Sequence, residues 1–385
     1  MLVGSVERVS QSRRISSLYR PELDALRFLA FFCVFIHHVL PRSTREYQQH
    51  LGPTLSRLLA SIANAGSFGL CLFFVLSAYL ISELLIRERL RTRTIHIKSF
   101  YTRRVLRIWP LYFFGVGIGL LWAYLSGVRK DVTRFLSYLV LAGNWYCTKH
   151  GWTPNPMVPL WSISIEEQFY LLWPAIARKT SEKGMYIVCA IMLADASGWL
   201  FYLGYTHATP DWTIWANTFV QFSMFAAGVL LALILRGNVL SVNISARIFL
   251  GLAGLGAWFL SAYFLHCKDL NVRPTAIQLN LGYLLVALGC VLLLCACLGL
   301  GEAVPAALVY LGRISYGLYV FHLLALWAAE KLLTGHVHQY AVRILATGIA
   351  GFLLTVGIAA VSYRYLETPF LRLKEKFSYI KTRPV

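Results

Sequence analysis

Charged side chains are scarce in this sequence, and their scarcity excludes an ordinary soluble domain. Asp, Glu, Lys and Arg make up 14% of the 385 residues, hydrophobic residues make up 58%, and the mean hydropathy is +0.60. Water cannot be the main solvent of such a chain. Repeats, low-complexity segments and long hydrophilic stretches are also lacking, which argues against a second folded domain. We therefore predict a single all-α membrane domain over residues 1–385, with its core at about 19–370 and short basic cytoplasmic tails at both ends.

Metal-ligand patterns are lacking too. The eight cysteines are scattered, and most fall within apolar stretches without the spacing of a zinc site. We expect them to act as small buried hydrophobic residues, and we expect no bound metal.

Long apolar stretches are abundant. A membrane-spanning helix needs about 20 mostly apolar residues, and we predict ten such stretches, centred near residues 33, 77, 117, 169, 194, 226, 256, 289, 323 and 352. A shorter apolar patch, Phe135 to Ala142, is better suited to a re-entrant or surface segment. The predicted fold is a polytopic membrane protein of about ten transmembrane helices.

The net charge of +19 raises the question of a nucleic-acid partner. The basic residues sit between the apolar stretches rather than along one surface, and no nucleic-acid-binding fold is recognisable, so we expect no nucleic acid. Placing both termini in the cytoplasm puts 24 Lys and Arg residues inside and 9 outside. Because cytoplasmic loops carry the excess of basic residues, this bias predicts that both ends are cytoplasmic.

Ionisable side chains within hydrocarbon cost several kcal/mol, so each one is a functional candidate. The first apolar stretch begins with Arg27 and ends near His37 and His38. Eleven positions make about three helical turns, so Arg27 and His38 share one face, about 16 Å apart. A histidine moves protons near neutral pH, which suits His38 to act as a general base. The alternative is a neutral histidine hydrogen-bonded to a neighbouring helix.

A basic group, Arg103, Arg104 and Arg107, precedes the third apolar stretch. Arg104 and Arg107 share a helical face, from which two guanidinium groups could bind phosphates bidentately. The alternative is a role in membrane topology and in contact with lipid headgroups.

Two adjacent glutamates open the fourth stretch. Ser162 and Glu166 lie four residues apart on one helical face, and Glu167 follows directly. Because carboxylates are costly inside a bilayer, we predict a functional role, as proton partner to a histidine or in acceptor binding.

A polar stripe opens the ninth stretch, where Ser315, Tyr319 and His322 follow one another at helical spacing. Hydrogen bonding between helices is the expected explanation for this stripe.

At these places the sequence resembles the acyltransferase 3 family, ten-span membrane enzymes that modify surface polysaccharides, lipid-linked sugars, nodulation factors and macrolides. The matching motifs extend from residue 19 to residue 370. In chain order they are Tyr19 to Arg27, with ten residues between Arg27 and His38; Phe73 to Ala78, around Ser77, where Ala78 replaces the family's glycine; Arg104 to Arg107; Ser162 to Glu166; Leu311 to Tyr316 with His322; and Tyr363 to Phe370.

The resemblance implies an O-acyltransferase with no permanently bound cofactor. Acyl-CoA, most simply acetyl-CoA, is the expected co-substrate on the cytoplasmic side, and a hydroxyl group is the expected acceptor from the other side. It implies His38 as general base or transient acyl carrier. Residue by residue, we expect catalytic roles for His38, Arg27, Glu166 and Glu167, donor binding by Arg103, Arg104 and Arg107, and substrate binding by Ser77, Ser162 and His322.

The expected acceptor is a carbohydrate, such as a cell-surface polysaccharide or a lipid-linked sugar, and the expected location is the bacterial inner membrane. Membrane lipids are further expected partners. Many family members carry an extracytoplasmic esterase-like domain, which here is expected to be a separate transferase.

Two alternatives remain open. Intramembrane His, Arg and Glu also build secondary transporters, although no symmetry between two halves is visible. A flippase or assembly partner for a glycan would keep the basic loop without needing His38.

Overall fold

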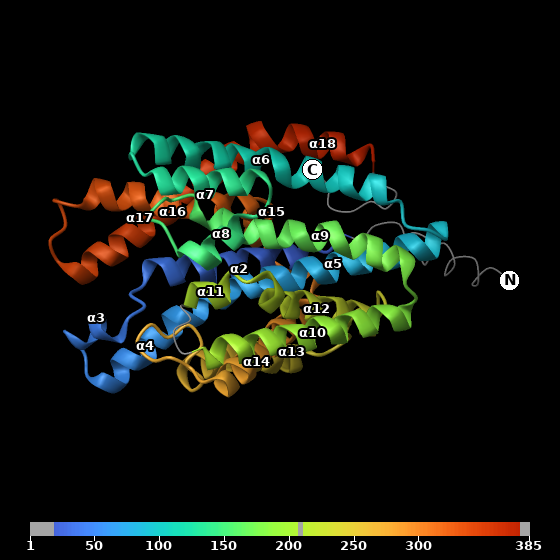
Figure 1. Cartoon of the computed structure of the whole chain (residues 1–385), viewed down its shortest axis with the longest axis horizontal. Helices are drawn as coiled ribbons and strands as arrows, with labels where there is room; N and C mark the ends of the chain where they lie inside the picture. The colour runs from blue at the N-terminus through green and yellow to red at the C-terminus, as the bar shows by residue number, and fades with distance from the viewer. Residues whose placement is uncertain (1–18, 207–210, 378–385) are drawn as a thin grey trace.

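The computed structural model describes residues 19–206 and 211–377. Residues 1–18 and 378–385, which hold most of the two predicted basic tails, lie outside the described residues. Within the described ranges every regular element is helical and no strand is present (Figure 1). The all-α prediction is therefore confirmed.

The ten predicted apolar stretches correspond to long helices. The centre of each stretch lies inside one helix of the described chain. In chain order these helices are α2 (Pro21–Val39), α5 (Gly69–Thr92), α6 (Ile97–Leu125), α9 (Trp161–Lys179), α10 (Glu182–Tyr205), α12 (Thr218–Leu235), α13 (Ile244–Tyr263), α14 (Ala276–Cys297), α16 (Ser315–Leu333) and α17 (Tyr340–Ser362).

By length and apolar composition, seven of the described helices are able to cross a membrane, or eight if α16 is joined to α15 (Ala306–Arg313), from which it is bent by 73°. The chain is thus a multi-pass membrane protein, while the number ten stays a prediction. The helices α2 and α9 are as long as α12 but carry at least three charged residues each. Arg27, Glu166 and Glu167 of the predicted site are among these charged residues.

The connections between helices gather at two ends of the bundle. At one end Arg20 forms an ion pair with Glu83 at 2.7 Å, and Arg103 donates to the carbonyl oxygen of Phe377 at 2.9 Å. The start and the end of the described chain therefore lie together, as an even number of crossings requires. At the other end Tyr340 donates to Glu46, and Arg57 donates to the Tyr263 carbonyl. Which end faces the cytoplasm stays a prediction.

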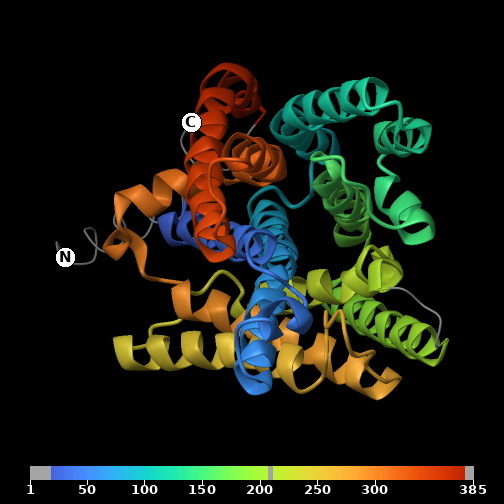
Figure 2. The same cartoon turned by 90° about the vertical axis from the view of Figure 1, so that its left-hand side faces the viewer.

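Short helices cover the end opposite the chain termini. They are α3 (Thr44–Gln48), α4 (Pro53–Ala65), α7 (Arg129–Leu139), α8 (Gly143–His150) and α11 (Asp211–Trp215), with the single turns η1 (Gly66–Phe68) and η2 (Val158–Leu160). The predicted surface patch, Phe135 to Ala142, falls in α7 and the turn after it. Tyr112 of α6 donates to the Tyr138 carbonyl at 2.8 Å, which holds α7 against the long helix α6 (Figure 2).

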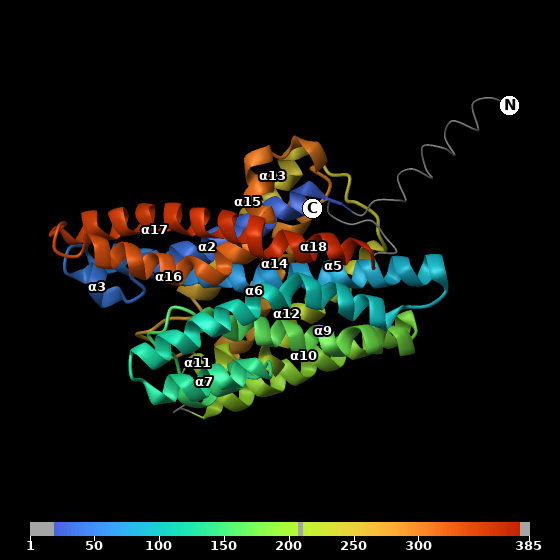
Figure 3. The same ribbon diagram turned by 90° about the horizontal axis from the view of Figure 1, so that it is seen from above.

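The remaining elements lie at the end where the described chain begins and finishes. A 3-10 turn, η3 (Gly301–Ala303), precedes α15, and a π-helical segment, η4 (Tyr363–Glu367), leads into the C-terminal helix α18 (Thr368–Glu375), which packs beside α6 (Figure 3).

The helix α5 runs through the centre of the bundle (Figure 2). In the spans that contain α5 and α12, 72% of the most apolar window is buried, against 22% for those of α10, α13 and α17, which face outward. A Cβ atom on Gly228 would lie 2.2 Å from the Val75 carbonyl oxygen, so only glycine allows α12 to pack this closely on α5. Gly312 likewise allows α15 to pack closely on α2, because a Cβ atom at this position would lie 1.8 Å from the carbonyl oxygen of Asp24.

Candidate active site

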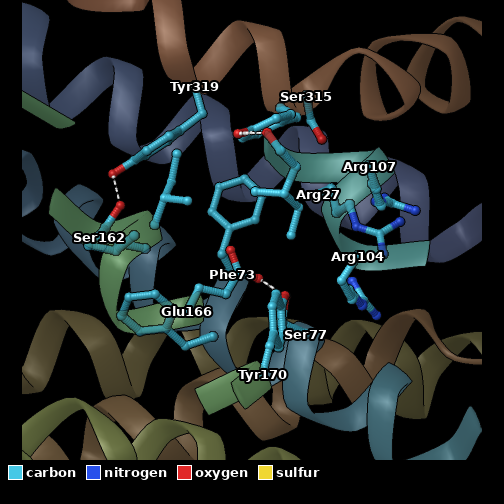
Figure 4. Close-up of a pocket in the computed structure, with 15 residues that line it drawn as sticks. Arg27, Phe73, Ser77, Arg104, Arg107, Ser162, Glu166, Tyr170, Ser315 and Tyr319 are labelled. Atoms are coloured by element: carbon cyan, nitrogen blue, oxygen red, sulfur yellow. Dashed lines mark hydrogen bonds between the residues drawn. The ribbon is translucent and has the colours of Figure 1, made fainter. Parts of the chain in front are cut away.

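A cavity of about 100 Å³ lies between five helices, α2, α5, α6, α9 and α16 (Figure 4). Arginines gather at one end of it and a pair of hydroxyl groups lies at the other, with Phe73 between them (Figure 4). Its lining consists of Arg27, Leu70, Phe73, Phe74, Ser77, Arg104, Arg107, Ile108, Ser162, Ile163, Glu166, Tyr170, Ser315, Tyr316 and Tyr319.

The arginine end is built from α2 and α6. Arg27 forms an ion pair with Asp24 at 2.7 Å, one helical turn earlier in α2. The Arg104 guanidinium lies over the ring of Tyr170, 4.7 Å from its centroid. Arg107 makes no hydrogen bond or ion pair within residues 19–206 and 211–377. Three guanidinium groups thus face a cavity whose only lining carboxylate is Glu166, and such a site attracts anions.

Glu166 is held by hydroxyl groups from two helices. Ser77 of α5 and Tyr170 of α9 both donate to Oε1 of Glu166, and the two hydroxyl oxygens lie 2.9 Å apart. The carboxylate is therefore fixed in place inside the cavity, and its second oxygen accepts no hydrogen bond from residues 19–206 or 211–377.

The other end of the cavity leads toward the histidines. The hydroxyl groups of Ser162 and Tyr319 are 2.7 Å apart, which joins α9 to α16. The Tyr319 ring lies 5.6 Å from the ring of His322, and His322 lies 5.0 Å from His38, both measured between centroids. A continuous line of polar side chains thus runs from the cavity to His38 near the far end of α2.

The hydrogen bonds of the two histidines fix their tautomers. Nδ1 of His38 donates to the Val34 carbonyl at 2.8 Å, and Nδ1 of His322 donates to the Tyr319 carbonyl at 2.6 Å. Because a carbonyl oxygen only accepts, each Nδ1 carries the proton and each Nε2 keeps a free lone pair. Nε2 of His322 is buried without a hydrogen-bond partner in the part of the chain that the structure describes, whereas His38 is exposed.

Six of the predicted site residues line one cavity: Arg27, Ser77, Arg104, Arg107, Ser162 and Glu166. The predicted helix-to-helix bonding of the polar stripe is also present, since Tyr319 bonds Ser162. Tyr170 was not predicted, although its position four residues after Glu166 puts it on the same helical face.

Two predicted residues point elsewhere. Arg103 forms an ion pair with Glu88 at 3.4 Å and bonds the Phe377 carbonyl, and Glu167 accepts a hydrogen bond from Nε1 of Trp109 at 2.9 Å. Each of the two points about 100° away from its neighbour in the cavity, Arg104 or Glu166, and its bonds hold it in that orientation. The roles predicted for Arg103 and Glu167 are therefore not supported by cavity contacts.

Comparison with known proteins places the chain in a family. The model of the acyltransferase 3 family, described as an acyltransferase domain, matches residues 20–364. The peptidoglycan O-acetyltransferase OatA of Listeria monocytogenes is 26% identical over 419 residues, covering 98% of this chain and 61% of the relative. The O-acetyltransferase OatA of Staphylococcus aureus is 24% identical over 384 residues, covering 92% and 57%.

The chain therefore spans about three fifths of the length of these relatives. No solved structure matches it. Because the family model extends from Arg20, at the start of α2, to Arg364, beyond the end of α17, this protein belongs to the acyltransferase 3 family.

Proposed function

We propose that the protein is a membrane-bound O-acyltransferase that moves an acyl group, in the simplest case acetyl, from cytoplasmic acyl-CoA to a hydroxyl group of a carbohydrate-containing acceptor. The observation that carries this proposal is the continuous line from an arginine-lined cavity, through Ser162, Tyr319 and His322, to the exposed His38. The relatives' names, which are those of O-acetyltransferases, support the reaction class, and the word peptidoglycan in the Listeria name supports a cell-surface polysaccharide as acceptor. A lipid-linked sugar is the other acceptor that we propose.

The arginine end is the proposed donor site. The phosphates of CoA are anionic, and guanidinium groups bind such groups with strong, charge-assisted hydrogen bonds. Arg107 supports this assignment best, because it has no partner of its own in the described chain. The distance from Arg27 to His38 along α2 is about 16 Å, a gap that the extended pantetheine arm of CoA would bridge.

The histidine pair is the proposed acceptor site. In the simplest route, Nε2 of His38 takes the proton of the acceptor hydroxyl, and the oxygen attacks the thioester carbonyl. The new C–O bond forms as the C–S bond breaks, and the departing thiolate receives the proton. The same lone pair serves a second route, in which Nε2 takes the acyl group itself and passes it on. The buried Nε2 of His322 would accept a hydrogen bond from an acceptor hydroxyl.

The other cavity residues have proposed supporting parts. Glu166, held by Ser77 and Tyr170, would orient the donor or balance the charge of the arginines, while Ser162 would contact substrate between the two sites. We place the enzyme in the bacterial cell membrane, with an extracytoplasmic transferase as a further partner.

The test is transfer of radiolabel from acetyl-CoA to extractable glycans or lipids in membranes that contain the protein. Wild-type protein is expected to transfer label, and His38→Ala is expected to transfer none. His37→Gln is the comparison from the neighbouring position: Nδ1 of His37 bonds the Ala63 carbonyl at 2.8 Å and its ring contacts that of His38, so a partial loss is expected. Equal transfer by wild type and His38→Ala would remove the proposed mechanism.

A further inference from the structure

A second cavity, of about 270 Å³, lies nearer the end of the bundle where the described chain begins and finishes. It is enclosed by α5, α9, α10 and α12, and it shares no lining residue with the arginine-lined cavity. Its walls are mostly aliphatic, from residues such as Leu85, Ile86, Met185 and Leu233. The exposed residues Leu90 and Arg236 mark where it meets the surface.

Two buried polar atoms line this cavity without a partner. They are Oγ of Ser82 and Nε1 of Trp173, in side chains that are 2% and 1% exposed, and neither has a hydrogen-bond partner in the described chain. Buried polar groups are nearly always hydrogen-bonded, and leaving one unpaired is costly. Trp173 only donates and Ser82 donates readily, so an occupant with acceptor oxygens at this depth would satisfy both.

The rim of the cavity is cationic. Arg236 is paired with Glu182 at 2.5 Å. Arg89 donates to the carbonyl oxygens of Thr180 and Ala177 at the end of α9, and no carboxylate of the described residues pairs with it. An anionic group at the rim would be attracted.

The unpaired polar atoms and the cationic rim lie at different depths along α5. Ser82 and Arg89 are seven residues apart, which is two turns or about 10 Å. A glycerophospholipid has an anionic phosphate, ester carbonyl oxygens that accept hydrogen bonds, and aliphatic chains, in that order from its head. The rim lies beside the exposed basic turn of Arg178 and Lys179, and such turns lie at headgroup level.

We propose that this cavity binds one anionic glycerophospholipid, with its phosphate at Arg89 and Arg236 and its ester oxygens at Ser82 and Trp173. The site is separate from the proposed acyl transfer and does not depend on it.

Native mass spectrometry of the purified full chain tests this, with phosphatidylglycerol and phosphatidylcholine of identical chains as probes. Wild type is expected to retain one phosphatidylglycerol in preference to phosphatidylcholine. Ser82→Ala and Trp173→Phe are each expected to weaken that binding by about fivefold, the loss of one hydrogen bond. Trp173→Phe keeps an aromatic ring stacked on Phe169, whose centroid lies 5.7 Å away, and size-exclusion elution checks that each variant is folded.

The matched control is Arg178→Gln, which removes an exposed charge of the same region that does not line the cavity. It is expected to leave phosphatidylglycerol binding unchanged. Equal retention of both lipids, or equal losses in Arg178→Gln and Arg236→Gln, would reduce the binding to general attraction at the surface and overturn the proposal. Displacement of the lipid by acetyl-CoA would also overturn it, because the cavity would then belong to the donor.

Discussion

The arginine end of the first cavity and the histidine pair beyond it differ in charge, although both lie within the same bundle. The first presents Arg27, Arg104 and Arg107 with one carboxylate in the lining. The second presents two imidazoles whose Nε2 atoms make no hydrogen bond to the described residues. A cluster of fixed positive charges is suited to hold an anion, and a lone pair on a neutral imidazole is suited to accept a proton. Under the proposed function, donor binding and proton transfer therefore fall to separate regions, and variants should separate their effects.

The largest expected effect is at His38. His38→Ala should lower kcat by about 10²- to 10⁴-fold, the usual contribution of a general base, with little change in the KM for acetyl-CoA. Steady-state kinetics of the purified enzyme measure both constants. His322→Ala should cost less and act on the KM for the acceptor. If His38→Ala also raised the KM for acetyl-CoA as much as it lowered kcat, the two regions would not be separate.

The arginines should show the opposite pattern. Loss of a charge-assisted hydrogen bond in Arg107→Gln should raise the KM for acetyl-CoA by about 10- to 100-fold, with a smaller change in kcat. Arg103→Gln is the matched control from the same helix, because Arg103 bonds Glu88 and the Phe377 carbonyl outside the cavity. Equal effects in the two variants would mean that position in the cavity does not decide donor binding.

Glu166 and Glu167 allow a second matched comparison. Glu166→Gln removes the carboxylate of the cavity and should lower kcat/KM by about tenfold or more. Glu167→Gln should cost much less, since an amide oxygen still accepts from Trp109. A larger loss from Glu167→Gln would show that the catalytic role predicted for Glu167 is right and that the cavity is not the centre of the site.

The smallest expected effect is at the hydrogen bond between Ser162 and Tyr319, which connects the two regions. Tyr319→Phe removes one hydroxyl group and should lower kcat about fivefold, which corresponds to about 1 kcal/mol. The double variant with Ser162→Ala should lose little more, because both changes break the same 2.7 Å contact. Fully additive losses in the measured rates would show that the two hydroxyl groups act independently.

Much of the fold could be predicted from hydrophobic pattern alone. Each predicted stretch became a long helix, and the short Phe135 to Ala142 patch stayed outside the long helices. The number of spans could not be confirmed in the same way, because α2 and α9 carry three or more charged residues each. The 73° bend between α15 and α16 also escaped prediction, since a single glycine such as Gly312 does not by itself specify that a helix bends at Ile314.

The sequence predicted which site residues share a face of one helix, but not which helices bring them together. Helical phase correctly grouped Arg104 with Arg107. It could not exclude Arg103, four residues before Arg107, or Glu167, three residues before Tyr170, because such spacings share a helical face. Their bonds to partners outside the cavity decide where these two side chains point. The bonds of Ser77 to Glu166 and of Ser162 to Tyr319 join different helices. Such contacts depend on how helices pack, which a single sequence does not specify, and the same holds for the second cavity between four helices.

The most direct test of the separation between the two regions is acetyl-CoA binding by purified His38→Ala and Arg107→Gln, measured beside the wild type by isothermal titration calorimetry. His38→Ala is expected to bind acetyl-CoA as the wild type does although it transfers no acetyl group, while Arg107→Gln is expected to bind at least about tenfold more weakly. Weakened binding in His38→Ala together with unchanged binding in Arg107→Gln would contradict the assignment of the donor to the arginines and of the chemistry to the histidines.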